Sequence, residues 1–113
     1  KYPDNVEFIK CPVLNNGKID LNYLTRALFE NNINSVLVEA GGKLNAELIK
    51  NNIVDKFYFF IAPKILGDTN ARQLFEGFYI ENINECSIIK FENIQYLDPD
   101  ILIEGYTSLS YPN

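Results

Sequence analysis

The chain has 113 residues, of which 47% are apolar and 22% are charged, and its 10 basic and 15 acidic side chains give a net charge of −5 at pH 7. This composition is typical of one folded domain, and the acidic excess argues against a nucleic-acid interface, which needs a basic surface. No histidine is present, which excludes histidine-based catalytic triads and metal sites that need imidazole, and no apolar run is long enough to span a membrane.

The first predicted elements are a strand and a helix. Apolar and polar residues alternate over residues 6–11, up to Pro12, which predicts a strand. Asp20 is a favourable N-cap, and leucines at positions 21, 24 and 28 fall on one face of the helix that we expect to follow it. The helix is predicted to end at the asparagine pair, Asn31 and Asn32.

A second strand and helix follow directly. Residues 35–40 form a nearly continuous apolar run, as in a strand that is covered on both faces. Gly41 and Gly42 come next, and a helix is predicted to begin near Lys43 and to end at residues 51–52.

Three more strands are predicted, at residues 56–62, 85–91 and 101–106. A turn at residues 97–100 makes the last two an antiparallel hairpin. The resulting order of strands and helices predicts an α/β fold with right-handed crossovers and a mixed, mostly parallel sheet that carries helices on its faces.

The two glycines mark the first candidate site. In such sheets, ligands bind beyond the carboxyl ends of the parallel strands. Glycines let a ligand approach the main chain, and the N–H groups at the start of the next helix favour an anion such as a phosphate, to which Lys43 adds a positive charge. An ordinary tight turn between strand and helix explains Gly41 and Gly42 as well, and the pattern alone leaves both interpretations open.

Glu39 is the second candidate. It places a carboxylate at the end of an otherwise apolar strand, where a charge is costly unless it has a partner. That partner is either a hydroxyl or amino group of a ligand, or a neighbouring lysine or loop backbone. The sequence does not decide between them.

Three ordered segments resemble the riboflavin biosynthesis reductases. Residues 32–45 resemble the segment G-I-x-S-V-L-V-E-G-G-x-x-L, residues 54–56 resemble V-D-E, and residues 60–67 resemble I-A-P-K-L-L-G. Residues 97–105 are similar to the closing hairpin of the same family. The chain thus resembles the carboxyl-terminal reductase domain of the bifunctional deaminase/reductase of riboflavin synthesis, the RibD family.

This resemblance implies a dihydrofolate-reductase-like, three-layer α/β/α fold with a C-terminal β-hairpin. It implies an NADPH-dependent oxidoreductase that reduces 5-amino-6-(5-phosphoribosylamino)uracil, with hydride delivered to C1′ to give the ribitylamino product. A cytoplasmic homodimer is expected. Glu39 would bind the substrate, no metal is implied, and no catalytic residue is assigned. The residues implied to bind the cofactor are Gly41, Gly42, Lys43, Leu44, Asn45, Ala46 and Glu47.

The domain expectation follows from the same resemblance. Residues 1–113 would form the carboxyl-terminal portion of one reductase domain, without its amino-terminal half and without a deaminase domain, and would be inactive alone. The alternatives are a non-catalytic module that binds a nucleotide or phosphate on the same scaffold, and a module that serves dimerisation.

Overall fold

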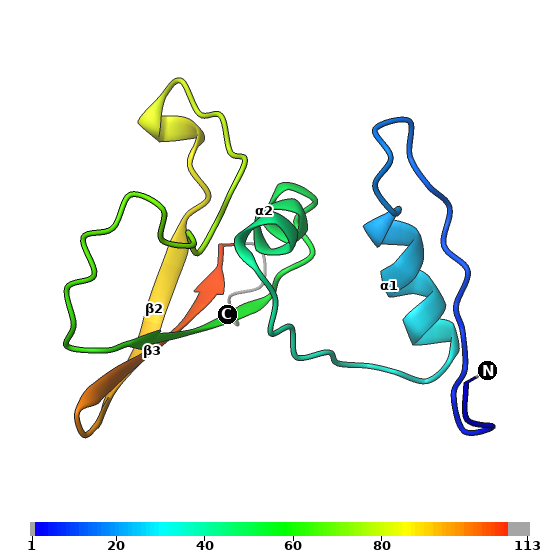
Figure 1. Ribbon diagram of the computed structural model, residues 1–113, viewed down its shortest axis with the longest axis horizontal. Helices are drawn as coiled ribbons and strands as arrows, with labels where there is room; N and C mark the ends of the chain where they lie inside the picture. The colour runs from blue at the N-terminus through cyan, green and yellow to red at the C-terminus, as the bar shows by residue number, and fades with distance from the viewer. Residues whose placement is uncertain (1, 109–113) are drawn as a thin grey trace. The chain divides into compact units, whose positions relative to one another are not determined.

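A computed structural model describes residues 2–108 and divides the chain after Glu39 into two units, each of which is described by itself (Figure 1). The first unit contains helix α1 (Leu21–Glu30), and the second contains helix α2 (Gly42–Lys50) and a three-stranded sheet. Within residues 2–108, no helix has the length and apolar character needed to cross a membrane.

Helix α1 begins as its sequence predicts. The Asp20 carboxylate accepts a hydrogen bond from the backbone N–H of Tyr23 at 3.0 Å, which satisfies one of the amides that a helix start leaves without an intrahelical partner. Leu21 and Ala27 are the buried residues of the helix. Ahead of it, Val13 and Ile19 form an isolated antiparallel bridge around a turn at Gly17, whose φ is +78°.

Both helices end through the same local motif. Asn32 and Asn52 adopt left-handed conformations, with φ of 62° and 53°. The following isoleucine then donates its N–H back into the last turn, Ile33 to the Leu28 carbonyl and Ile53 to the Leu48 carbonyl, each at 3.0 Å. This is the Schellman arrangement, which asparagine tolerates because it enters the left-handed region more readily than most residues. The predicted ends at the asparagine pairs are confirmed.

The sheet consists of β1 (Lys56–Ile61), β2 (Ile89–Leu97) and β3 (Asp100–Thr107), with β3 in the middle (Figure 1). Both pairings are antiparallel, and β2 carries an irregularity between Phe91 and Asn93. A turn at residues 98–99 joins β2 to β3. Before β2 lies a short 3-10 helix, Ile83–Glu85.

Four expectations about strands differ from what the described residues form. Residues 6–11 and 35–40 form no strand, and the sheet contains no parallel pairing, so the mixed, mostly parallel sheet is not found there. An extended segment becomes a strand only when another strand satisfies its N–H and C=O groups. Within residues 2–108 no segment pairs with residues 35–40, and Leu37 is 75% exposed. The strand expected at residues 85–91 begins four residues later, at Ile89.

A polar network crosses all three strands on one face of the sheet. The Lys56 ammonium of β1 lies 2.7 Å from the Glu104 carboxylate of β3. The amides of Asn93 and Gln95, both on β2, donate to the same carboxylate at 3.1 and 3.2 Å. The Lys56 ammonium also lies 4.7 Å from the centre of the Tyr58 ring. These bonds hold the three strands in register, because each strand contributes a side chain to one carboxylate.

The network lowers the pKa of Glu104 below its ordinary value, first through the hydrogen bond from Lys56 and then through that from Asn93. The bond to Glu104 raises the pKa of Lys56, which therefore stays charged at neutral and acidic pH. A carboxylate with a lowered pKa in the folded state stabilises that state above its unfolded pKa, near 4.5, and loses this contribution as the pH falls through the folded value.

We therefore expect Glu104→Gln to lower the melting temperature at pH 7, and we expect its difference from the wild type to shrink as the pH falls below about 4.5. Thermal unfolding followed by circular dichroism from pH 7 to about pH 3 measures both. Glu92→Gln is the matched control, because it removes an exposed carboxylate from β2 that is outside the network. A difference for Glu104→Gln that does not vary with pH would contradict the role of the ion pair.

Candidate functional site

The start of α2 is an open helix terminus. Gly41 is its N-cap, in extended conformation with φ of −83° and ψ of 166°, and no side chain caps the helix. The Gly41 carbonyl accepts from the N–H groups of Leu44 and Asn45 at 3.1 and 3.2 Å. The first turn contains no acidic residue, and Lys43 is exposed there. The positive end of the helix dipole and the charge of Lys43 together favour an anion at this turn.

The residues implied to bind the cofactor divide into two groups in the structure. Gly41, Lys43 and Leu44 are exposed at the first turn. The others make contacts within the protein: Gly42 and Ala46 are buried, Asn45 donates to two backbone carbonyls, and Glu47 lies 3.5 Å from the Lys50 ammonium. The exposed first turn is thus the part of this stretch that is accessible to a ligand.

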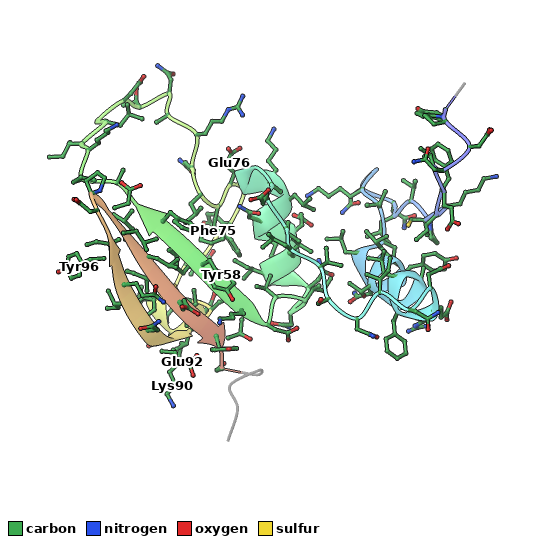
Figure 2. All side chains as sticks on the ribbon, turned by 90° about the horizontal axis from the view of Figure 1, so that it is seen from below. Tyr58, Phe75, Glu76, Lys90, Glu92 and Tyr96 are labelled. Carbon is green, nitrogen blue, oxygen red and sulfur yellow. The ribbon has the colours of Figure 1, made fainter. Side chains whose placement is uncertain are left out.

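Gly42 is required by a close approach of the main chain. A methyl group at this position would overlap the carbonyl oxygen of Gln73, and it would lie 2.8 Å from the Glu76 side chain. The Glu76 N–H donates to the Gly42 carbonyl at 3.0 Å, and Figure 2 shows Glu76 beside the start of α2. The two neighbouring glycines therefore differ, since a methyl group at Gly41 would meet nothing within 4 Å.

Residues 73–78 lie along α2, a contact that the sequence analysis missed. Besides the bonds to Gly42 and Asn45, the Lys50 ammonium donates to the Gly77 carbonyl at 2.6 Å and lies 5.3 Å from the centre of the Phe78 ring. Most of these contacts involve the main chain of residues 73–78. Because main-chain contacts do not depend on the side chains of residues 73–78, no pattern of residue types in that segment predicts them. Gly42, which faces the backbone of this segment, is the one feature of the sequence that could have indicated the contact.

Glu39 lies at the end of the first unit and is exposed. Its backbone belongs to the extended residues 35–40, which form no strand. The expectation that this carboxylate sits on a covered strand, and so needs a partner to offset burial, is wrong for the structure described. Its proposed contact with substrate therefore rests on the resemblance of residues 32–45 rather than on burial.

Both cysteines of the chain lie within the described residues. Cys11 and Cys86 are free and half-buried. Among residues 2–108, no cluster of three cysteine, aspartate or glutamate side chains is arranged to hold a metal ion.

Comparison with known proteins identifies the relatives of this chain. The family model of the RibD C-terminal domain matches residues 2–103. The riboflavin biosynthesis protein RibD of Buchnera aphidicola subsp. Baizongia pistaciae is 39% identical over 95 residues, which cover 82% of this chain and 25% of that protein. The Escherichia coli RibD is 33% identical over 103 residues, which cover 91% of this chain and 28% of that protein.

A shorter relative carries a more specific name. The 5-amino-6-(5-phosphoribosylamino)uracil reductase of Buchnera aphidicola subsp. Acyrthosiphon pisum is 35% identical over 86 residues, 76% of this chain and 41% of that protein. Among solved structures, Acinetobacter baumannii RibD matches with a TM-score of 0.72 and 26% identity, over 80% of this chain and 26% of that one. The chain thus spans between 25% and 41% of the length of these relatives.

The geometry at the two glycines generates a paired prediction. Gly42→Ala is expected to displace residues 73–76, because its methyl group would overlap the Gln73 carbonyl, although alanine favours a helix by about 1 kcal/mol over glycine. Gly41→Ala should leave residues 73–76 in place. Amide chemical shifts of residues 73–76 measure the difference. Equal shifts in the two variants would contradict the close approach at Gly42.

Proposed function

The chain belongs to the RibD C-terminal domain family, and from that premise we propose that it is part of an NADPH-dependent reductase. The reaction is the conversion of 5-amino-6-(5-phosphoribosylamino)uracil to its ribitylamino product in riboflavin biosynthesis. One observation carries the proposal: 76% of the chain matches a relative named as the reductase of that pyrimidine. The relatives named as riboflavin biosynthesis proteins support the same pathway.

Residues 1–113 are, in this proposal, the carboxyl-terminal portion of one reductase domain within a longer protein. The similarity to Acinetobacter baumannii RibD over 80% of the chain supports this assignment. The complete domain would have the dihydrofolate-reductase-like, three-layer fold. Residues 35–40, apolar on both faces but unpaired within residues 2–108, would join its sheet as a strand. The chain alone would then be inactive, because the strand next to the site lacks its neighbours.

The first turn of α2 has the properties that a dinucleotide phosphate needs. Gly41 has no side chain and open space around it, no acidic residue stands in the first turn, and Lys43 adds a cation. We assign Gly41 and Lys43 to the pyrophosphate of NADPH, whose negative charge the helix dipole favours, with Leu44 exposed beside them. When bound, NADPH supplies the hydride. The proposed preference for NADPH over NADH follows from the family and not from a particular residue of this chain.

Glu39 is assigned to the substrate. An exposed carboxylate accepts hydrogen bonds from hydroxyl or amino groups, both of which this substrate offers. Its role would be to orient the sugar for reduction, because a hydride transfer depends mainly on positioning and electrostatics. No side chain of this chain is assigned as a general acid.

The proposed protein is a cytoplasmic homodimer. Phe91, Ile94 and Tyr96 lie on one face of β2 and are 59%, 58% and 84% exposed, which leaves an apolar surface suited to a second copy. Figure 2 shows Tyr96 at the outer side of the sheet. Sedimentation velocity of the whole protein tests the dimer. A dimer without NADPH binding would favour the alternative, a non-catalytic dimerisation module.

An NMR titration of the chain with NADPH tests the cofactor site. We expect amide shifts centred on Gly41, Lys43 and Leu44. The first turn of α1 is an internal control, because the Asp20 carboxylate already caps it and repels an anion. Equal shifts at both helices would indicate general anion binding. An absence of shifts at millimolar NADPH, in this chain and in the full-length protein, would contradict the cofactor site.

Glu39→Gln in the full-length protein tests the substrate site. The change removes a charged hydrogen-bond acceptor, so kcat/KM for the pyrimidine should fall about tenfold, while KM for NADPH stays unchanged. Steady-state kinetics measures both constants. Glu7→Gln, an exposed carboxylate in the same unit, is the control and should leave both unaffected. Wild-type kinetics from Glu39→Gln would remove Glu39 from the substrate site.

A further inference from the structure

The Asn45 side chain joins Ala40, the residue ahead of the α2 N-cap, to residues 73–78, the segment that lies along the helix. The side-chain amide nitrogen of Asn45 donates to the Ala40 carbonyl at 3.4 Å and to the Leu74 carbonyl at 3.2 Å. A carboxamide nitrogen carries two hydrogens and serves both acceptors at once. Asn45 therefore connects the backbone ahead of the N-cap to a segment 29 residues further along the chain.

The backbone ahead of α2 has no other side-chain restraint that the structure describes at the cap. Gly41 contributes no side-chain capping hydrogen bond, and glycine restricts its own backbone less than any other residue does. The peptide between Ala40 and Gly41 carries the Gly41 N–H, which lies immediately ahead of the first N–H groups of α2. The bond from Asn45 to the Ala40 carbonyl fixes that peptide at its oxygen.

Residues 73–78, which contain the Leu74 carbonyl that accepts from Asn45, are themselves bonded to α2. The Glu76 N–H binds the Gly42 carbonyl at 3.0 Å, and the Lys50 ammonium binds the Gly77 carbonyl at 2.6 Å. Gly42 allows the Gln73 carbonyl to lie directly against the helix. Residues 73–78 are thus held at several points along α2.

We propose that Asn45 is a positioning residue for the cofactor turn: its amide holds the Ala40–Gly41 peptide against residues 73–78, and so orients the Gly41 N–H, beside the start of α2, for a phosphate. This inference rests on the proposed function, and it assigns Asn45 a role different from contact with the cofactor. Loss of the amide would leave α2 intact and release the Ala40 and Leu74 carbonyls, so that the turn and residues 73–78 are joined only by the bonds to Gly42 and Lys50.

The experiment uses the full-length protein and Asn45→Leu, which removes the donor without adding a charge and keeps a good helix former. Hydrogen exchange read by mass spectrometry, without cofactor, should become about tenfold faster at the hydrogen-bonded amides of these segments, Leu44 and Glu76, as expected when a bond of ordinary net strength is lost. Exchange in residues 46–50 should not change. A purely structural role would instead speed exchange throughout α2.

Two further variants test whether the change in exchange comes from the Asn45 amide. Asn31→Leu removes a matching amide, which donates to the Ala27 carbonyl at 2.8 Å at the end of α1, and should leave both segments unaffected. Asn45→Asp repeats the exchange measurement with a side chain of the same shape, in case leucine disturbs the packing.

Cofactor binding completes the test. The Kd for NADPH should rise about tenfold in Asn45→Leu and stay at the wild-type value in Asn31→Leu. Unchanged exchange at residues 73–78, or an unchanged Kd in a protein that binds NADPH, would overturn the inference. A wild-type protein that does not bind NADPH would instead contradict the proposed function, and the exchange data would still report whether Asn45 couples the two segments.

Discussion

Strand β3 is the element on which the second unit depends. It hydrogen-bonds to β1 on one side and to β2 on the other, and every strand contact in the described sheet includes it. Its Glu104 gathers Lys56 from β1 and two amides from β2 around one carboxylate. Main-chain pairing fixes the order of the strands, and the side-chain network resists slippage between them, because a shift by one residue would turn Glu104 to the opposite face.

Local signals in the sequence predicted those features whose hydrogen bonds join residues close together in the chain. Asp20 caps α1 with its own side chain, and Asn32 and Asn52 end their helices through bonds within a few residues. Residues 35–40 needed more than local information. Their apolar pattern is typical of a strand that is covered on both faces, but a pattern cannot tell whether a partner strand is present. Within residues 2–108 none pairs with them, and the chain spans only part of the length of its relatives.

The candidate site likewise has one part that the sequence predicted and one part that it did not. Gly41 and Gly42 lie at a junction that the sequence marked, and α2 begins there as expected. The contacts of residues 73–78 with α2 were not foreseen, because the carbonyls of Leu74 and Gly77 accept their bonds whatever side chain those residues carry. A backbone contact between distant segments can be recognised in the sequence only where it leaves no room for a side chain. Here that position is Gly42.

The two adjacent glycines lack a side chain for different structural reasons. At Gly42 the missing side chain makes room for another part of the protein, whereas at Gly41 it leaves open space. A substitution at Gly42 is opposed by packing, whereas at Gly41 the protein itself leaves room for a methyl group. If the α2 start holds a phosphate, its inner side is fixed by residues 73–78 while its outer side stays free. Such a turn keeps its N–H groups aligned before a ligand arrives, which lowers the ordering cost of binding.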